Sequence, residues 1–179
     1  TASGHSALSS NTTGTRNIAI GPLAYDAADT EDDNLAIGYD ALGGAIAGGE
    51  FNVAIGNYSL DANTEGDNNT ALGYAGLGAN TTGTNNTAVG SNASQNITTG
   101  SQNTSVGRYS LRLNTEGDGN TAIGYYSLYN NSSGAYNTAL GYQSGNKITQ
   151  GDYNTTLGYQ AGDVITTGDN NVIIGYAAD

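Results

Sequence analysis

The side chains of this sequence that could do chemistry are mainly carboxylates and tyrosines, and both recur at a regular spacing. Carboxylate oxygens are the ligands that calcium prefers, so a column of them could hold calcium. The nonapeptide GGxGxDxUx, which is typical of calcium-binding β-rolls, does not occur. We therefore favour a solvated acidic rim over calcium and expect no other cofactor. The acidic column consists of Asp32, Glu50, Asp67, Asp118, Asp152 and Asp169.

Six tyrosines share a second recurring position, directly after a Gly of the repeat. Aromatic rings suit sugar rings and protein partners, so these tyrosines are the candidate ligand-binding residues. Stacking of the rings on one another, which would stiffen a fibre, is the alternative that we favour. The six are Tyr39, Tyr74, Tyr125, Tyr142, Tyr159 and Tyr176.

Nothing else in the chain points to catalysis. There is one histidine, His5, and no cysteine, and no nucleophile elbow, phosphate loop or zinc motif is present. A solenoid lyase would need carboxylates clustered in a groove, whereas here they are dispersed along a rim. We predict that the protein is not an enzyme.

The charge balance excludes two classes of partner. Sixteen acidic and four basic residues give a net charge of −12, which would repel nucleic acid and anionic membranes. No apolar run approaches the ~20 residues of a membrane-spanning helix. We expect no nucleic-acid binding and no membrane insertion in this segment.

The sequence is built from one short repeat, and this outweighs a composition that by itself would predict disorder. Consecutive anchor glycines lie 17 residues apart, except for one spacing of 18 between Gly38 and Gly56. Such a period indicates an all-β, parallel solenoid of about ten coils. We predict two short strands and two turns per coil, one domain over residues 1–179, and a stack on the order of 50 Å long at ~4.8 Å per coil. The anchors are Gly21, Gly38, Gly56, Gly73, Gly90, Gly107, Gly124, Gly141, Gly158 and Gly175.

An asparagine stands four residues before every anchor. Stacked asparagines form hydrogen-bonded ladders in other stacked β structures, so a structural role is predicted for this column. Its members are Asn17, Asn34, Asn52, Asn69, Asn86, Asn103, Asn120, Asn137, Asn154 and Asn171.

The apolar residues predict a narrow interior. We expect each coil to bury the Ile, Leu or Val before its anchor, an Ala, and one further aliphatic side chain. This further side chain stands either four or seven residues after the anchor. One coil has Leu128 at the first position and Asn131 at the second, whereas the next coil has Gly145 at the first and Ile148 at the second. Because an empty slot leaves a cavity and a doubly filled one is overpacked, we expect both positions to fill the same volume.

Two coils depart from this rule. Their paired positions hold Tyr25 with Ala28, and Leu42 with Ile46. The second is also the 18-residue coil, so we expect its extra residue to form a bulge.

So few apolar groups cannot offset the ordering entropy of a lone chain. Either the roll is very long or several rolls pack together, and a homotrimer with one face of each chain on a common axis would achieve the second. Exposed sheet ends invite aggregation, so we also expect this segment to be a fragment of a longer fibrous protein.

Threonine forms two further columns, which raise the possibility of an ice-binding face. Ice binding needs a flat face with two threonine files, whereas Asn and Ala flank the first file in the sequence, and Thr is also a good strand residue. The columns are Thr70, Thr87, Thr104, Thr121, Thr138 and Thr155, and Thr64, Thr81, Thr98, Thr115, Thr149 and Thr166.

The motifs NTAIGYYSL, NTALGYQSG, NVAIGNYSL and NNTAVGSNAS resemble the head repeats of trimeric autotransporter adhesins and similar repeats of phage tail fibres. The resemblance covers nearly the whole chain and implies a left-handed parallel β-roll assembled as a homotrimer. The family's usual coil is shorter, near 14 or 15 residues, so one turn is expected to be longer here.

From this resemblance we expect an extracellular segment, on a bacterial surface or a virion, that contributes to host attachment. A host glycan or surface protein is the possible partner besides the chain itself. An ice-binding solenoid and a spacer stalk without a ligand are the alternatives.

Overall fold

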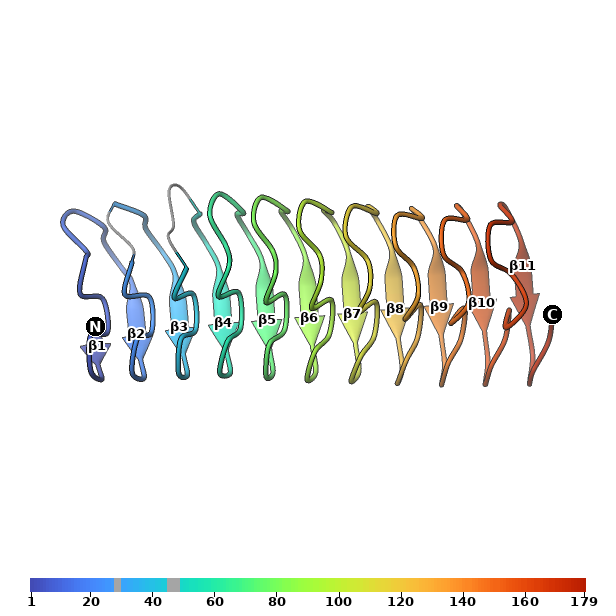
Figure 1. Ribbon diagram of the computed structural model, residues 1–179, viewed down its shortest axis with the longest axis horizontal. Helices are drawn as coiled ribbons and strands as arrows, with labels where there is room; N and C mark the ends of the chain where they lie inside the picture. The colour runs from blue at the N-terminus through green and yellow to red at the C-terminus, as the bar shows by residue number, and fades with distance from the viewer. Residues whose placement is uncertain (28–29, 45–48) are drawn as a thin grey trace.

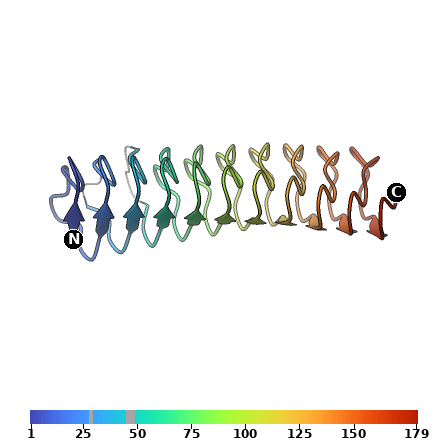
Figure 2. The same cartoon turned by 90° about the horizontal axis from the view of Figure 1, so that it is seen from below.

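The computed structural model describes residues 1–27, 30–44 and 49–179. The chain forms one row of coils that runs without branching from the N-terminal to the C-terminal end (Figures 1 and 2). The predicted parallel β-solenoid of about ten 17-residue coils is therefore confirmed.

One short strand per coil, of three residues in every strand after β1, builds a single parallel sheet, in which neighbours along the chain are also neighbours in the sheet. Equivalent residues pair from coil to coil, as Thr121 with Thr138 and Ala122 with Ala139. The strands are β1 (Ala2–Ser3), β2 (Ile18–Ile20), β3 (Leu35–Ile37), β4 (Val53–Ile55), β5 (Thr70–Leu72), β6 (Thr87–Val89), β7 (Thr104–Val106), β8 (Thr121–Ile123), β9 (Thr138–Leu140), β10 (Thr155–Leu157) and β11 (Val172–Ile174).

The prediction of two strands per coil was wrong in the described residues. The segment after each anchor contains residues with left-handed backbone, such as Tyr109 (φ 61°) and Leu111 (φ 50°), and such residues curl the chain instead of extending it. This segment still bonds to neighbouring coils, since the Leu111 N–H donates to the Ser127 carbonyl at 2.9 Å. Hydrogen bonds between coils therefore surround the cross-section, although only one side is a β-sheet.

The placement of the aliphatic residue before each anchor was also predicted wrongly. Alternate residues of a strand point to opposite faces, and the central Ala of β8, Ala122, is completely buried. Its neighbour Ile123 is 37% exposed, and Leu140 in the next coil is 43% exposed. The small alanine points inward because the coil is narrow, so the larger aliphatic residue points outward.

The remaining interior prediction agrees with the structure. Leu128 and Ile148 are both completely buried, and so is Asn131. A Cβ atom placed on Gly145 would lie 3.0 Å from Leu128 Cδ2 and 3.3 Å from Ile148 Cδ1. Ile148 thus occupies the space beside Gly145 that a leucine takes in other coils.

The two irregular coils are partly described. Tyr25 is buried in place of the usual leucine, and its hydroxyl accepts a hydrogen bond from Asn34 Nδ2. Burial raises the pKa of Tyr25. Ala28, Ile46 and the expected bulge lie outside the described residues, but Leu35 of β3 still pairs with Val53 of β4. The extra residue is therefore absorbed between these strands and not within them.

The anchor glycines bring successive coils into backbone contact. Gly124 has a φ of 135°, which L side chains rarely adopt, and a Cβ atom there would collide with the carbonyl of Gly141 in the next coil. Only glycine fits such a position.

Replacing Gly124 by alanine should therefore lower the free energy of unfolding by more than about 1–3 kcal/mol, the usual cost of a strained backbone alone. Gly76→Ala is the matched control, because a Cβ atom there would meet Ala71 Cβ at 3.6 Å, an ordinary contact. Urea unfolding followed by circular dichroism measures both. Equal stability of the two variants would contradict the role assigned to the anchor.

Candidate functional site

The asparagine column forms the predicted ladder inside the solenoid. From Asn17 to Asn154, the Oδ1 atom of each asparagine accepts the backbone N–H of the asparagine in the next coil. The Asn137 N–H, for example, donates to Asn120 Oδ1 at 2.9 Å. The Asn120 Nδ2 donates to the Gly134 carbonyl at 2.8 Å, and the Asn137 Nδ2 donates directly to Asn120 Oδ1 at 3.2 Å. The ladder therefore joins side chains mainly to backbone. Its members are buried up to Asn154, which marks a structural and not a ligand-binding column.

The acidic column has a structural role that sequence reasoning missed. The Asp152 Oδ1 accepts the N–H of Ala135 in the preceding coil at 2.8 Å, and the Asp169 Oδ1 accepts the N–H of Asp152 at the same distance. The N–H and hydroxyl of Thr15 likewise hold the pKa of Asp32 below its usual value. Each of these carboxylates satisfies a corner N–H that would otherwise lack a protein partner.

Among the described residues, no group of three or more His, Asp or Glu side chains is arranged to hold a metal ion.

The candidate tyrosines form two different arrangements. Tyr125, Tyr142, Tyr159 and Tyr176 stack in a continuous row, with centroids 5.1–5.5 Å apart and planes within 18° of parallel. Their ring faces therefore cover one another, which leaves edges and hydroxyls for a partner. This geometry suits the stiffening role more directly than the stacking of a sugar on a ring face.

Tyr39 and Tyr74 lie apart from that row. Tyr58, which sequence reasoning did not single out, packs between them edge-on, with centroids at 5.3 Å from Tyr39 and 5.8 Å from Tyr74. It escaped notice because it stands two residues after its anchor, one position beyond the tyrosine column.

A second group missed from the sequence combines tyrosine with arginine, and we call it the Arg–Tyr cluster: Arg108, Tyr109, Arg112, Tyr126 and Tyr129. The guanidinium carbons of Arg108 and Arg112 lie 4.4 and 5.1 Å from the centre of the Tyr109 ring. The sequence signal for this cluster is the segment RYSLR, residues 108–112, which contains two of the four basic residues of the chain.

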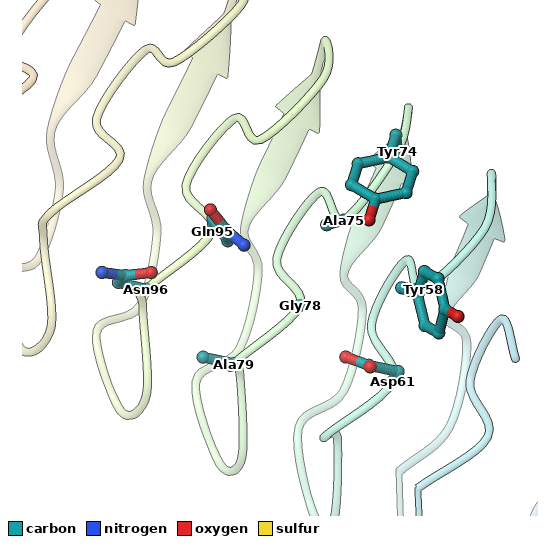
Figure 3. Close-up of a pocket in the computed structure, with 8 residues that line it drawn as sticks. All are labelled: Tyr58, Asp61, Tyr74, Ala75, Gly78, Ala79, Gln95 and Asn96. Atoms are coloured by element: carbon teal, nitrogen blue, oxygen red, sulfur yellow. The ribbon is translucent and has the colours of Figure 1, made fainter.

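A hollow of about 410 Å³ adjoins this cluster, since Gln95 lines the hollow and accepts a hydrogen bond from Arg112. Figure 3 shows the residues that line it. It is lined by the segments that follow Gly56, Gly73 and Gly90, with Tyr58, Tyr74 and Asp61 on one side and Gln95 on the other. Burial, and then the charge of Asp40, raise the pKa of Asp61.

The outward face of the sheet carries two parallel files of side chains. In β5 to β10 one file is threonine, and the other is the aliphatic residue before the anchor. The Asn and Ala that flank the threonine in the sequence point inward, so the two files are neighbours on one face. The threonines of the second column serve the stack instead, as the Thr115 hydroxyl donates to the Ser132 carbonyl at 3.1 Å.

In the part of the chain that is described, no helix is long and apolar enough to cross a membrane.

Comparisons with protein-family models, with curated proteins and with solved structures found no match.

The acidic corner yields a test. Asp152→Ala should lower the free energy of unfolding by about 0.5–1.5 kcal/mol, the usual net value of one hydrogen bond, because the Ala135 N–H loses its acceptor. Asp152→Asn keeps a carbonyl oxygen in the same place and should cost less than half as much. Thermal unfolding at neutral pH measures both variants. Asparagine as damaging as alanine would mean that the charge, and not the hydrogen bond, matters.

Proposed function

We propose that this chain is a non-enzymatic, extracellular fibre segment of a cell-surface adhesin or phage tail fibre, and that three copies assemble through the outward sheet face. The observation that carries the proposal is the aliphatic file, which places an exposed Ile, Leu or Val on successive coils. Leu72, Ile123, Leu140 and Leu157 are between 37% and 45% exposed. The resemblance of the repeat motifs to trimeric adhesin heads favours three copies.

The interior explains why this face needs a partner. A regular coil buries one large aliphatic side chain, two small residues and two asparagines, as in Asn120, Ala122, Ser127, Leu128 and Asn131. Covering the exposed part of each outward aliphatic would contribute about 1 kcal/mol, at roughly 1.5–3 kcal/mol for a fully buried side chain. Repeated along the stack, this gain would stabilise an assembly of long chains.

Attachment to a host is the biological role that this proposal gives to the fibre. A stack that is straight and laterally supported can hold a binding surface at a distance from its base. If no ligand binds this segment, the same architecture serves as a spacer.

Native mass spectrometry tests the assembly. The wild-type chain should have three times the 18.1 kDa monomer mass, and Ile123→Asp with Leu140→Asp should release folded monomers, because carboxylates would be forced into the shared apolar face. Tyr136→Ser with Tyr153→Ser is the control, since these exposed tyrosines lie at another corner. A wild-type chain that stays a folded monomer, or forms only dimers, would overturn the trimer.

Ice binding is the second candidate, favoured by the finding that the threonine and aliphatic files share one face of a regular sheet. The two functions compete for this face, because a trimer would cover it. A monomer that shows thermal hysteresis, abolished by Thr104→Tyr with Thr121→Tyr, would support ice binding. A monomer without hysteresis would exclude it.

A further inference from the structure

Among the described residues, two of the four basic side chains have no acidic partner. Arg16 pairs with Asp33, and Lys147 pairs with Asp163 at 3.5 Å. In the described residues, Arg108 and Arg112 lie within ion-pair distance of no carboxylate. This is unexpected in a chain with sixteen acidic residues, and the two unpaired guanidinium groups can attract an anionic group.

The two guanidinium groups are held in position and still have donors to spare. Arg112 donates through Nε to Gln95 Oε1 at 2.9 Å and through Nη1 to the Tyr129 hydroxyl at 3.2 Å. Arg108 donates to the Tyr109 hydroxyl at 2.9 Å. A guanidinium has five N–H donors, so most of those on Arg108 and some on Arg112 remain for a ligand.

The Arg–Tyr cluster continues into the hollow. Gln95 lines the hollow and also accepts the hydrogen bond from Arg112, so it joins the two features. Asp61, at the far side of the hollow, belongs to a coil three positions before that of Arg112, which is roughly 14 Å along the stack at ~4.8 Å per coil. The combined surface is long enough for several linked units and offers an acid, an amide, phenols and two cations.

The backbone around this surface is already engaged. The Tyr109 N–H donates to the Ser91 carbonyl at 3.2 Å, and the Tyr126 N–H donates to the Arg108 carbonyl at 3.3 Å. An extended peptide could not add as a strand here, because strand addition needs free backbone groups. Recognition must use side-chain hydroxyls, aromatic rings and guanidinium groups, a set that matches the hydroxyls, C–H faces and carboxylate of an acidic sugar.

We infer that the hollow and the adjoining Arg–Tyr cluster bind an oligosaccharide that carries a carboxylated sugar, with Arg108 and Arg112 pairing with the carboxylate. Asp61 and Gln95 accept hydrogen bonds from sugar hydroxyls. The net charge of −12 disfavours a long polyanion, so the ligand is a short oligosaccharide with a few carboxylates. This inference rests on the proposed function in one respect: the sugar would be the host ligand to which the attachment segment binds.

Binding is tested by titrating the whole chain with tri-galacturonate and with the neutral analogue trigalactose. The chain has no tryptophan, so its emission comes from thirteen tyrosines. Five of these lie at the site, so a change in emission is the first readout and calorimetry is the second: Tyr58, Tyr74, Tyr109, Tyr126 and Tyr129. Tri-galacturonate should bind at least about tenfold more tightly than trigalactose, because a hydrogen bond to a charged group contributes about 1.5–3 kcal/mol.

Arg108→Gln with Arg112→Gln should weaken tri-galacturonate binding at least about tenfold. The matched control is Arg16→Gln with Lys147→Gln, which changes the net charge equally and should leave the affinity unchanged. If the glutamine variant does not fold by circular dichroism, Arg108→Lys with Arg112→Lys keeps the charge, loses the bidentate geometry, and should bind with intermediate affinity.

Three outcomes would overturn the inference: no binding of tri-galacturonate, equal binding of both sugars, or equal losses in the cluster and control variants. None of them changes the mass of the assembly. Failure of the sugar site and failure of the proposed trimer are therefore seen in separate measurements.

Discussion

The contact between the backbones of successive coils is the constraint on which the rest of this structure depends. At every anchor before Gly175 the chain passes so close to the next coil that no side chain fits, and the carbonyl of Gly141 occupies the space beside Gly124. Every interior side chain must therefore fit into a layer about 4.8 Å thick. Asparagine is favoured there because its amide can bond to the next coil within such a layer, as Asn120 does with Asn137.

The thin layers have a consequence for the surface. An interior made of alanine, serine and asparagine has room for one large aliphatic side chain per coil, so the aliphatic residue of each strand lies outside. The protein thus presents an apolar file next to a threonine file on a regular sheet. Assembly and ice binding are both explanations of this one face, and they differ in whether another chain or water covers it.

Stacking also converts the repeat into columns, and most of the columns serve the stack itself. Tyrosines such as Tyr142 and Tyr159 cover each other's faces, and the carboxylate of Asp152 accepts an N–H of the preceding coil. The residues with free chemical capacity are those that break the repeat. Arg108 and Arg112 occur once, next to a hollow, and this is why they carry the binding site that we infer.

The sequence by itself determined the period, the parallel stacking, the asparagine ladder and the exchange of Leu128 for Ile148, because these follow from residue types that recur at fixed spacing. It did not determine which strand residues face outward, since Ala122 and Ile123 are both apolar and only the width of the coil decides between them. Nor did it identify the carboxylate as a cap or bring Arg112 to Gln95. These contacts join residues 17 positions apart, and their geometry is set when the turns close and the coils come into contact.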